Sequence, residues 1–297
     1  MSLVINHNLM ATTAARNLGT AYNNLSTSVS RLSSGLRITN ASDDAAGLAV
    51  RELMRADISA LNQGVRNAND AISLIQTADG ALSVIDEKLI RMKELAEQAA
   101  TGTYNSDQRI IIDSEYQAMA SEITRIASAT DFNGIHLLDG TLSSATHSGA
   151  TALSTGKMKI HFGTKNDSAE DYYYIQIGTA TASALGVGNS AVTSASAHNI
   201  STQANAQKAL EGIEAAIVSK DNIRANLGAL QNRLENTITN LQIQSENLQA
   251  SESRISDVDV SSEMTEFVRQ QILTQSAVAM LSQANSMPRL ALQLLGG

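Results

Sequence analysis

The stretch ISALNQGVRNANDAISLIQTADGALSVIDEKLIRMKELAEQAA, residues 58–100, decides the architecture of this chain of 297 residues. Its apolar residues return every three or four positions, which is the spacing of one face of an α-helix. They are Ile58, Leu61, Val65, Ala68, Ile72, Ile75, Leu82, Ile85, Leu89, Met92, Ala96 and Ala99. The pattern predicts one helix over residues 45–100, about 80 Å long at roughly 1.5 Å per residue. A rod of that length needs partner helices to cover its apolar face.

Other stretches of the chain show the same helical spacing. A shorter stripe over residues 18–36 ends at residues 39–44, where Thr, Asn, Ser and Asp side chains favour a helix stop and restart. A further helix begins at Asn105 or Ser106 and ends near Gly134, which suits a left-handed turn position. A second long helix is predicted over residues 203–256, and a last helix lies between a break at residues 256–259 and Pro288.

The middle of the chain, residues 141–202, is rich in Ser, Thr, Ala and Gly and loses the helical spacing. Met158, Ile160 and Phe162 alternate with polar neighbours, which is the period of a half-buried strand. Residues 172–177 form a second candidate strand, and residues 163–171 are a polar connection between the two. The pattern predicts a β-hairpin on the surface.

The order of these elements predicts a mainly α fold, in which long antiparallel helices form a coiled-coil or bundle rod with a small β-hairpin region in the middle of the chain. We expect a rod domain from residues 45–140 and 203–256, with the hairpin and surface loops of residues 141–202 attached to it. Residues 1–44 and 257–297 form a terminal-helix domain. Isolated helices are marginal in water, so we expect these two arms to be disordered in the monomer and to fold against neighbours.

The charges of the two arms favour their pairing. Residues 1–42 hold three arginines and no acidic residue, whereas residues 257–297 hold four acidic residues and two arginines. Two independently solvated faces would carry the same charges, and that alternative stays open at this point. Salt would screen pairing of this kind.

Composition favours long helices and excludes several functions. Proline, which breaks helix interiors, occurs once, at Pro288. A net charge of −8 argues against nucleic-acid binding, which usually needs a basic face. The absence of cysteine excludes disulfides and thiolate metal sites. No run of about 18 apolar residues exists, so we expect no membrane insertion, and the first seven residues lack the pattern of a cleaved secretory signal.

Two ends of the chain carry motifs that resemble a known family. The sequences RLSSGLRI (residues 31–38), DDAAGL (43–48) and RNANDAISLIQTADGAL (66–82) are similar to the N-terminal region of bacterial flagellins. Phe132-Asn133-Gly134 fits the turn ahead of that family's β region. QQIL (270–273), SQANSMP (282–288) and Leu294-Leu295 resemble the flagellin C-terminal helix. The likeness covers roughly residues 1–140 and 205–297, and agreement at both ends is highly specific.

The resemblance implies a structural subunit, not an enzyme, that polymerises into the extracellular flagellar filament used for swimming. It implies an inner layer of terminal helices and a next layer of long helices with a hairpin. Only about 65 residues separate the helical halves, so we expect a minimal form without a large outer domain. The implied partners are further copies of the chain, the flagellar export apparatus, a cytoplasmic chaperone for the C-terminal arm, and the filament cap and hook-junction proteins.

Three sets of residues follow as candidate sites. The first would pack the inner core of the filament: Leu18, Leu25, Val29, Leu32, Leu36, Met264, Val268, Ile272 and Leu281. The second would pack the rod: Ile72, Ile75, Leu82, Ile85, Leu89, Leu227, Leu234 and Leu241. The third, implied by the resemblance, is a face for the vertebrate Toll-like receptor that senses flagellin: Arg91, Leu95 and Glu115. A lateral contact in the filament is the alternative for this face. Lys93 and Glu97 differ from the residues that are most common at these positions in the family.

The residues support no catalytic, metal or cofactor site. No His-Glu-x-x-His pair occurs among the scattered histidines. Gly186-Val187-Gly188 lacks the flanking elements of a phosphate loop and is interpreted as a connection. Asp43 and Asp44 are interpreted as helix-start caps and not as metal ligands. The alternatives that remain are a hook–filament junction protein, which shares flagellin-like ends, and a helical secreted effector or adhesin.

Overall fold

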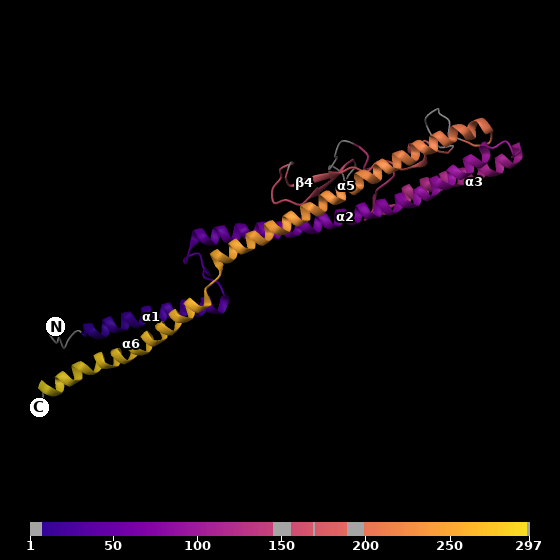
Figure 1. Ribbon diagram of the computed structural model, residues 1–297. Helices are drawn as coiled ribbons and strands as arrows, with labels where there is room; N and C mark the ends of the chain where they lie inside the picture. The colour runs from indigo at the N-terminus through magenta and orange to yellow at the C-terminus, as the bar shows by residue number, and fades with distance from the viewer. Residues whose placement is uncertain (1–7, 145–155, 169, 189–198, 296–297) are drawn as a thin grey trace. The chain divides into compact units, whose positions relative to one another are not determined.

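The computed structural model describes residues 8–144, 156–168, 170–188 and 199–295 (Figure 1). The helices are α1 (Leu9–Ser34), α2 (Ala45–Ala100), α3 (Ser106–Ala129), α4 (Ala182–Leu185), α5 (Gln203–Ser256) and α6 (Val260–Leu295). The strands are β1 (Asp131–Phe132), β2 (Ile135–His136), β3 (Met158–His161) and β4 (Tyr172–Ile175). The mainly α fold with a small β region in the middle is confirmed, although α6 continues through Pro288.

The chain forms two compact units. The arm unit comprises Met1–Ile58 with Glu246–Gly297, and the rod unit comprises Ser59–Ser245. The units divide inside α2 and α5, whereas the sequence suggested a division at the ends of these helices. The first turns of α2 belong with the arms because Arg51 Nη1 donates to the carbonyl of Ile38 at 2.9 Å, and Arg55 lies 3.8 Å from Glu252.

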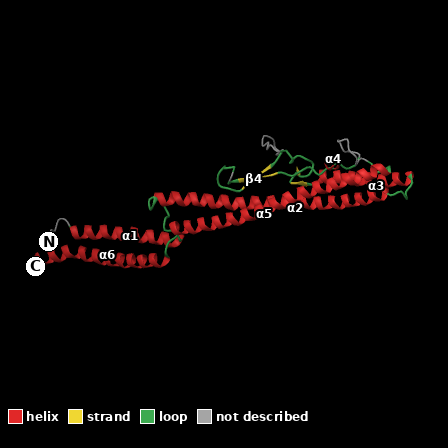
Figure 2. Cartoon of the chain, turned by 45° about the horizontal axis from the view of Figure 1, so that its top comes forward, coloured by secondary structure: helices red, strands yellow, loops and turns green. Residues whose placement is uncertain are grey.

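In the rod unit, α2 and α5 run antiparallel, side by side in both views (Figures 1 and 2). Three polar pairs show the direction, because the number rises on one helix as it falls on the other. Asn62 bonds Ser245 at 3.4 Å, Asp79 bonds Arg224 at 2.7 Å, and Asp86 bonds Lys220 at 2.5 Å. Lys220 is 2% exposed and also lies 2.7 Å from Asp221, so its charge is paired inside the interface.

Helix α3 begins where the sequence indicated. The Asn105 side chain accepts from the backbone of Gln108, and the Gln108 side chain accepts from the backbone of Asn105, which is a reciprocal capping box. The chain then turns at Asn133 and Gly134, which have φ values of +53° and +79°. Positive φ at both central residues is the requirement of a tight two-residue hairpin turn, here between β1 and β2.

The predicted β-hairpin is present as β3 paired antiparallel with β4, and Ile160 lies opposite Tyr173. Its inner face packs on the helices. The ring of Tyr173 lies 3.6 Å from the Arg233 guanidinium, and Asn67 on α2 donates to the carbonyl of His161 at 2.8 Å. Gly64 lets α2 approach the hairpin, because a Cβ there would lie 2.0 Å from the Phe162 carbonyl oxygen. A backbone contact this close requires glycine.

The core of the rod unit is a continuous apolar cluster contributed by α2, α3, α5 and the β region. Of the predicted rod residues, all but Leu241 lie in or against it. Ile75, Leu82, Ile85, Leu89, Leu227 and Leu234 are buried members, Ile72 packs against the cluster half-buried, and Leu241 is 6% exposed. The cluster explains why a helix as long as α2 can be apolar along one face.

Candidate assembly surface

In the arm unit, α1 and α6 pack antiparallel along a coiled-coil seam. The Asn8 amide donates to the carbonyl of Ala284 at 2.8 Å near one end, and Arg31 Nη1 lies 3.8 Å from Glu263 Oε2 near the other. The covered positions alternate in steps of three and four, the period of a coiled coil. They are Ala11, Ala14, Leu18, Ala21, Leu25, Ser28 and Leu32 on α1, and Glu263, Phe267, Gln270, Thr274, Ala277, Leu281 and Ala284 on α6.

The seam covers only one face of each helix and leaves large apolar side chains in the open. Of the predicted inner-core residues, Leu18, Leu25, Leu32, Leu36 and Leu281 are half-buried. Val29 is 48% exposed, Met264 and Val268 are 44% exposed, and Ile272 is 57% exposed. The apolar spacing in the sequence predicted Val29 as a packing residue, whereas the coiled-coil period places Ser28 in the seam.

Further exposed apolar residues lie on the same two helices, outside the predicted set. They are Leu9, Met10, Tyr22, Leu273, Val278 and Met280. Several of them line an apolar groove of about 700 Å³ between the ends of α1 and α6, together with Ala14, Ala21, Ala277 and Ala284. Exposed apolar surface on this scale marks a binding surface in soluble proteins. The only sequence signal for these residues is that they are apolar and lie off the main stripe.

The two linkers between arms and long helices are joined to each other. Leu36 and Asp257 form an isolated antiparallel bridge, the backbone N–H of Arg37 donates to the Ser256 carbonyl at 2.6 Å, and that of Val258 donates to the Gly35 carbonyl at 3.0 Å. The Arg37 guanidinium also donates to the Ile255 carbonyl at 2.7 Å. The two linkers therefore run antiparallel to each other and form a short two-stranded connection at the ends of the arms.

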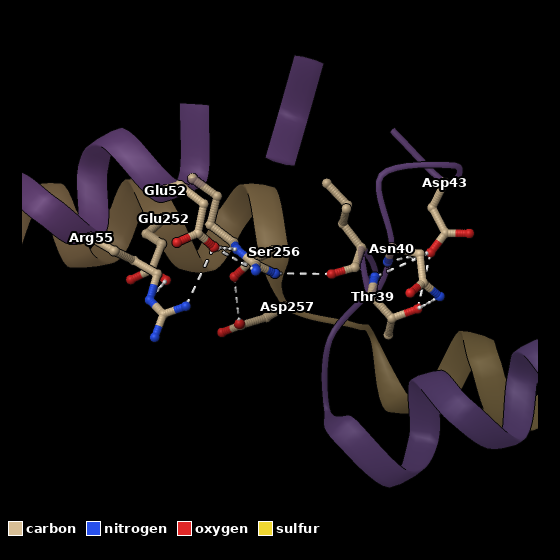
Figure 3. A network of polar contacts seen from close by, with 10 residues as sticks. Thr39, Asn40, Asp43, Glu52, Arg55, Glu252, Ser256 and Asp257 are labelled. Atoms are coloured by element: carbon tan, nitrogen blue, oxygen red, sulfur yellow. Dashed lines mark hydrogen bonds and ion pairs between the residues drawn. The ribbon is translucent and has the colours of Figure 1, made fainter. Parts of the chain in front are cut away.

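Side chains extend this connection into the polar network shown in Figure 3. Asp43 accepts hydrogen bonds from the backbone of Asn40 and of Thr39 and from the Thr39 hydroxyl, and these bonds lower the pKa of Asp43. Asp44 accepts from the backbone of Gly47 at 2.9 Å and so caps the start of α2. Glu52 receives the Arg51 guanidinium at 2.7 Å, which lowers the pKa of Glu52. The two aspartates thus act on the backbone at the helix start.

The predicted receptor residues lie on α2 and α3 in the rod unit. Arg91 is half exposed and donates to Glu115 at 2.8 Å and to Glu94 at 3.0 Å. These hydrogen bonds, with Glu115 first, raise the pKa of Arg91. Leu95 is 1% exposed and belongs to the core, so it is not part of the accessible face. Arg91 and Glu115 are brought together at the surface, and Leu95 lies beneath it.

Other motifs have structural explanations. Gly186 ends α4 in a left-handed conformation, and Gly188, also at positive φ, packs so tightly that a Cβ would lie 2.4 Å from the Ala120 Cβ. The Tyr116 phenol bonds the Gly188 backbone, and burial raises the pKa of Tyr116. This Gly-x-Gly is a packed connection.

Among the described residues there is no cluster of His, Cys, Asp and Glu side chains suited to a metal ion. A search of the same residues found no helix apolar and long enough to cross a membrane.

Comparison with known proteins assigns the chain to a family. Residues 5–143 match the model of the bacterial flagellin N-terminal helical region, and residues 210–295 match that of the bacterial flagellin C-terminal helical region. The flagellar filament 33 kDa core protein of Treponema phagedenis is 42% identical over 99% of this chain and 100% of its own length. The flagellin of Halalkalibacterium halodurans is 42% identical with the same coverage.

A solved structure is also similar. The crystal structure of Bacillus cereus flagellin is 30% identical, with a TM-score of 0.46, over 63% of this chain and 94% of that one.

The two family models match the two helical halves of the chain, and the relatives match along nearly its full length. This chain therefore belongs to the bacterial flagellin family, a family of structural proteins.

Proposed function

We propose that this chain is the structural subunit of an extracellular flagellar filament used for swimming, a helical polymer of identical copies, and that it has no catalytic role. The observation that carries the proposal is the exposed apolar surface of α1 and α6, including Met264, Val268 and Ile272. Relatives named as flagellins and filament core proteins support it. Two helices cannot cover each other on more than one face, so the remaining apolar faces need helices from neighbouring copies.

The energetics make assembly marginal and reversible. Burying a Leu, Ile or Val side chain contributes roughly 1.5–3 kcal/mol. Ordering a backbone residue costs about 1–2 kcal/mol, so arms that are disordered in the free monomer gain little per residue when they fold. We expect α1 and α6 to order fully only on polymerisation, and filaments to dissociate on heating or in acid. Hydrogen exchange of residues 9–34 and 260–288 in free subunits and in filaments would measure this ordering.

The test is negative-stain electron microscopy of the purified chain after salt-driven or seeded polymerisation. We expect helical filaments from the full chain and none from a chain that lacks residues 270–297. Ile272→Ser is the sharper variant, because it changes one exposed residue of the arm unit and should lower filament yield. Ile243→Ser is its matched control, since Ile243 is 54% exposed on α5 in the rod unit. A full chain that stayed monomeric even with filament seeds would overturn the filament role and favour a hook–filament junction protein.

Export and assembly partners follow from the same arms. We propose that the chain is exported unfolded through the flagellar export apparatus, because arms without a stable core of their own offer little resistance to unfolding. A cytoplasmic chaperone would cover the apolar face of α6 before export, and the filament cap and hook-junction proteins would receive the arms afterwards. Co-purification of the chaperone with the full chain, and its loss when residues 270–297 are removed, would test the first of these contacts.

A face for the vertebrate Toll-like receptor is a second proposal, centred on Arg91 and Glu115. Their ion pair is exposed, so both side chains are accessible in a free subunit. Leu95 would act only by supporting the helix surface from the core. Arg91→Ala should lower receptor signalling more than Arg125→Ala, which removes another exposed arginine of an ion pair on the rod unit. Equal signalling by both variants would contradict this face.

A further inference from the structure

The exposed methionines of this chain lie on the arm helices. The sequence contains nine methionines, and Met1 lies outside the residues that the structure describes. Met10 on α1 is 51% exposed, and Met264 and Met280 on α6 are 44% and 62% exposed. No other described methionine is exposed to this extent. The accessible thioether sulfurs are therefore concentrated on the surface to which assembly was assigned above.

The methionines of the rod unit are protected by packing. Met92 is 0% exposed and belongs to the apolar core, and Met119 and Met158 pack half-buried against that core. Met54, at the start of α2, is also half-buried. A solvent-borne oxidant must reach the sulfur to react with it, so these residues should be oxidised more slowly than the exposed ones.

Three methionines line the apolar groove between the ends of α1 and α6, which has a volume of about 700 Å³. They are Met10, Met280 and the half-buried Met287. The lining is mostly apolar, and the hydroxyl of Thr13, one of its few polar groups, already donates to the Leu9 carbonyl at 2.9 Å. Methionine suits such a surface because its side chain is flexible and adapts to a partner. The same side chain is also the one that a peroxide can make polar.

We propose that Met10, Met264, Met280 and Met287 form an oxidation site, at which hydrogen peroxide converts free subunits into a form that polymerises poorly. The sulfur lone pair attacks one peroxide oxygen, an S–O bond forms and the O–O bond breaks. Sulfur loses two electrons, and the second oxygen leaves as hydroxide and takes the remaining proton to give water. The inference rests on the proposed polymerisation and adds to it a chemical control of the same surface.

A sulfoxide opposes assembly because its oxygen is a strong hydrogen-bond acceptor in place of an apolar group. Covering that oxygen with apolar side chains of a neighbouring copy leaves it unpaired, which weakens association about tenfold for each such group. Once a subunit is assembled, the neighbouring copies cover the sulfurs and protect them. Oxidation of the free subunit does not require ordered arms, because disordered arms would expose these sulfurs further.

Mapping the oxidised positions is the first test. Free subunits and filaments are treated with hydrogen peroxide, and tryptic peptides are quantified by mass spectrometry. In free subunits, Met10, Met264 and Met280 should be oxidised at least about tenfold faster than Met92, since a buried sulfur reacts only when the core opens. In filaments the arm methionines should slow towards the rate of Met92. Equal rates at arm and core methionines in free subunits would overturn the proposal.

Seeded polymerisation of oxidised subunits is the second test. Peroxide should raise the critical concentration of the natural chain at least about tenfold, and methionine sulfoxide reductases of both stereospecificities should reverse the effect. The measured quantity is the ratio of critical concentrations with and without peroxide, so a change in the untreated value cancels. Changing all four proposed methionines to leucine should bring this ratio near one. Met54→Leu is the control and should keep the ratio of the natural chain.

A variant that needs no oxidant keeps the test decisive if the fourfold variant assembles poorly. Met280→Gln places a polar group at the most exposed of these positions and should raise the critical concentration about tenfold. Ile243→Gln makes the same kind of change at a residue that is 54% exposed on α5 and should leave it unchanged.

Two results would overturn the oxidation site: a peroxide ratio that stays high in the fourfold leucine variant, and equal effects of Met280→Gln and Ile243→Gln. A third result bears on the proposed function alone. An untreated natural chain that formed no filaments even with seeds would count against polymerisation, whereas the oxidation rates of free subunits are measured without filaments and would still show whether the arm methionines are the reactive ones.

Discussion

The rod unit and the arm unit contain similar apolar residues but differ in how completely they bury them. In the rod unit, Ile85, Leu89 and Ile123 are fully buried, because several helices and a hairpin surround a common core. In the arm unit, the buried apolar residues among those described are Ala21, Ile38 and Ala284, whereas larger ones such as Ile272 remain exposed. Two helices can cover only one face of each other, so the arm unit stays open. The difference indicates that the rod unit carries the stability of the free subunit and the arm unit carries its assembly.

The largest expected effect separates the two units directly. Leu89→Ala removes a fully buried side chain from the rod core and should lower the free energy of unfolding of the free subunit by about 2–5 kcal/mol. Ile272→Ala removes an exposed one and should change it by less than about 0.5 kcal/mol. Denaturant unfolding followed by circular dichroism measures both. A comparable loss from Ile272→Ala would mean that the arm unit contributes to the core stability of the monomer.

The docking of the hairpin on α2 is the next test of the rod unit. Gly64→Ala drives a Cβ into the Phe162 carbonyl and should cost about 1–3 kcal/mol, since the backbone must move. Gly80→Ala is the matched control on the same helix, where nothing lies within 4 Å of the added Cβ. It should stabilise the chain by about 0.5–1 kcal/mol, because alanine favours a helix interior. Two changes of the same sign would contradict the close approach at Gly64.

Two ion pairs between α2 and α5 should differ in strength according to burial. Lys220→Ala leaves Asp86 without its buried partner and should cost about 1–2 kcal/mol, the value being limited because Asp86 is partly exposed. Arg224→Ala breaks a more exposed pair with Asp79 and should cost less than about 1 kcal/mol. Thermal unfolding at low and high salt measures both. A strong salt dependence for Lys220 would contradict its burial.

Acid should loosen the linker network of the arm unit before it affects the rod core. The pKa values of Asp43 and Glu52 are lowered in the folded chain by hydrogen bonds to the Asn40 and Thr39 backbone and to Arg51. A lowered folded-state pKa means that the contribution is present above the unfolded pKa, about 4, and is lost as pH falls through the folded value. The protection of the Thr39 and Asn40 amides from hydrogen exchange, relative to an unstructured chain at the same pH, should therefore fall between pH 6 and pH 3, and Asp43→Asn should remove much of this pH dependence. Protection that does not respond to either change would contradict the assigned hydrogen bonds.

The secondary structure was largely predictable from local signals. The three- and four-residue spacing together with the break at residues 39–44 predicted the bounds of α2, and Asn105 predicted the cap of α3. Alternation of Met158 and Ile160 with lysines predicted β3. These signals are short-range, because they depend on helix and strand period and on capping chemistry. The short helix α4 and the two-residue strands β1 and β2 gave no comparable period, since each is shorter than one repeat.

Pairing partners and exposure were not predictable in the same way. The sequence chose Val29 as a seam residue because it is apolar, but the coiled-coil period in three dimensions places Ser28 there. It grouped Leu95 with Arg91 and Glu115 by resemblance, but the packing of α2 buries Leu95. Hydropathy identifies which residues should avoid water and does not state which helix will cover them.

The sequence by itself determined the family, the helices and the position of the hairpin, because period, capping and family motifs are properties of the local chain. Only the tertiary structure decided which apolar residues are buried within one subunit and which remain exposed. It also placed Arg31 within 3.8 Å of Glu263, although they come from opposite ends of the chain. The physical reason is that burial and ion pairing depend on distances between segments far apart in sequence, and helical periodicity does not specify those distances.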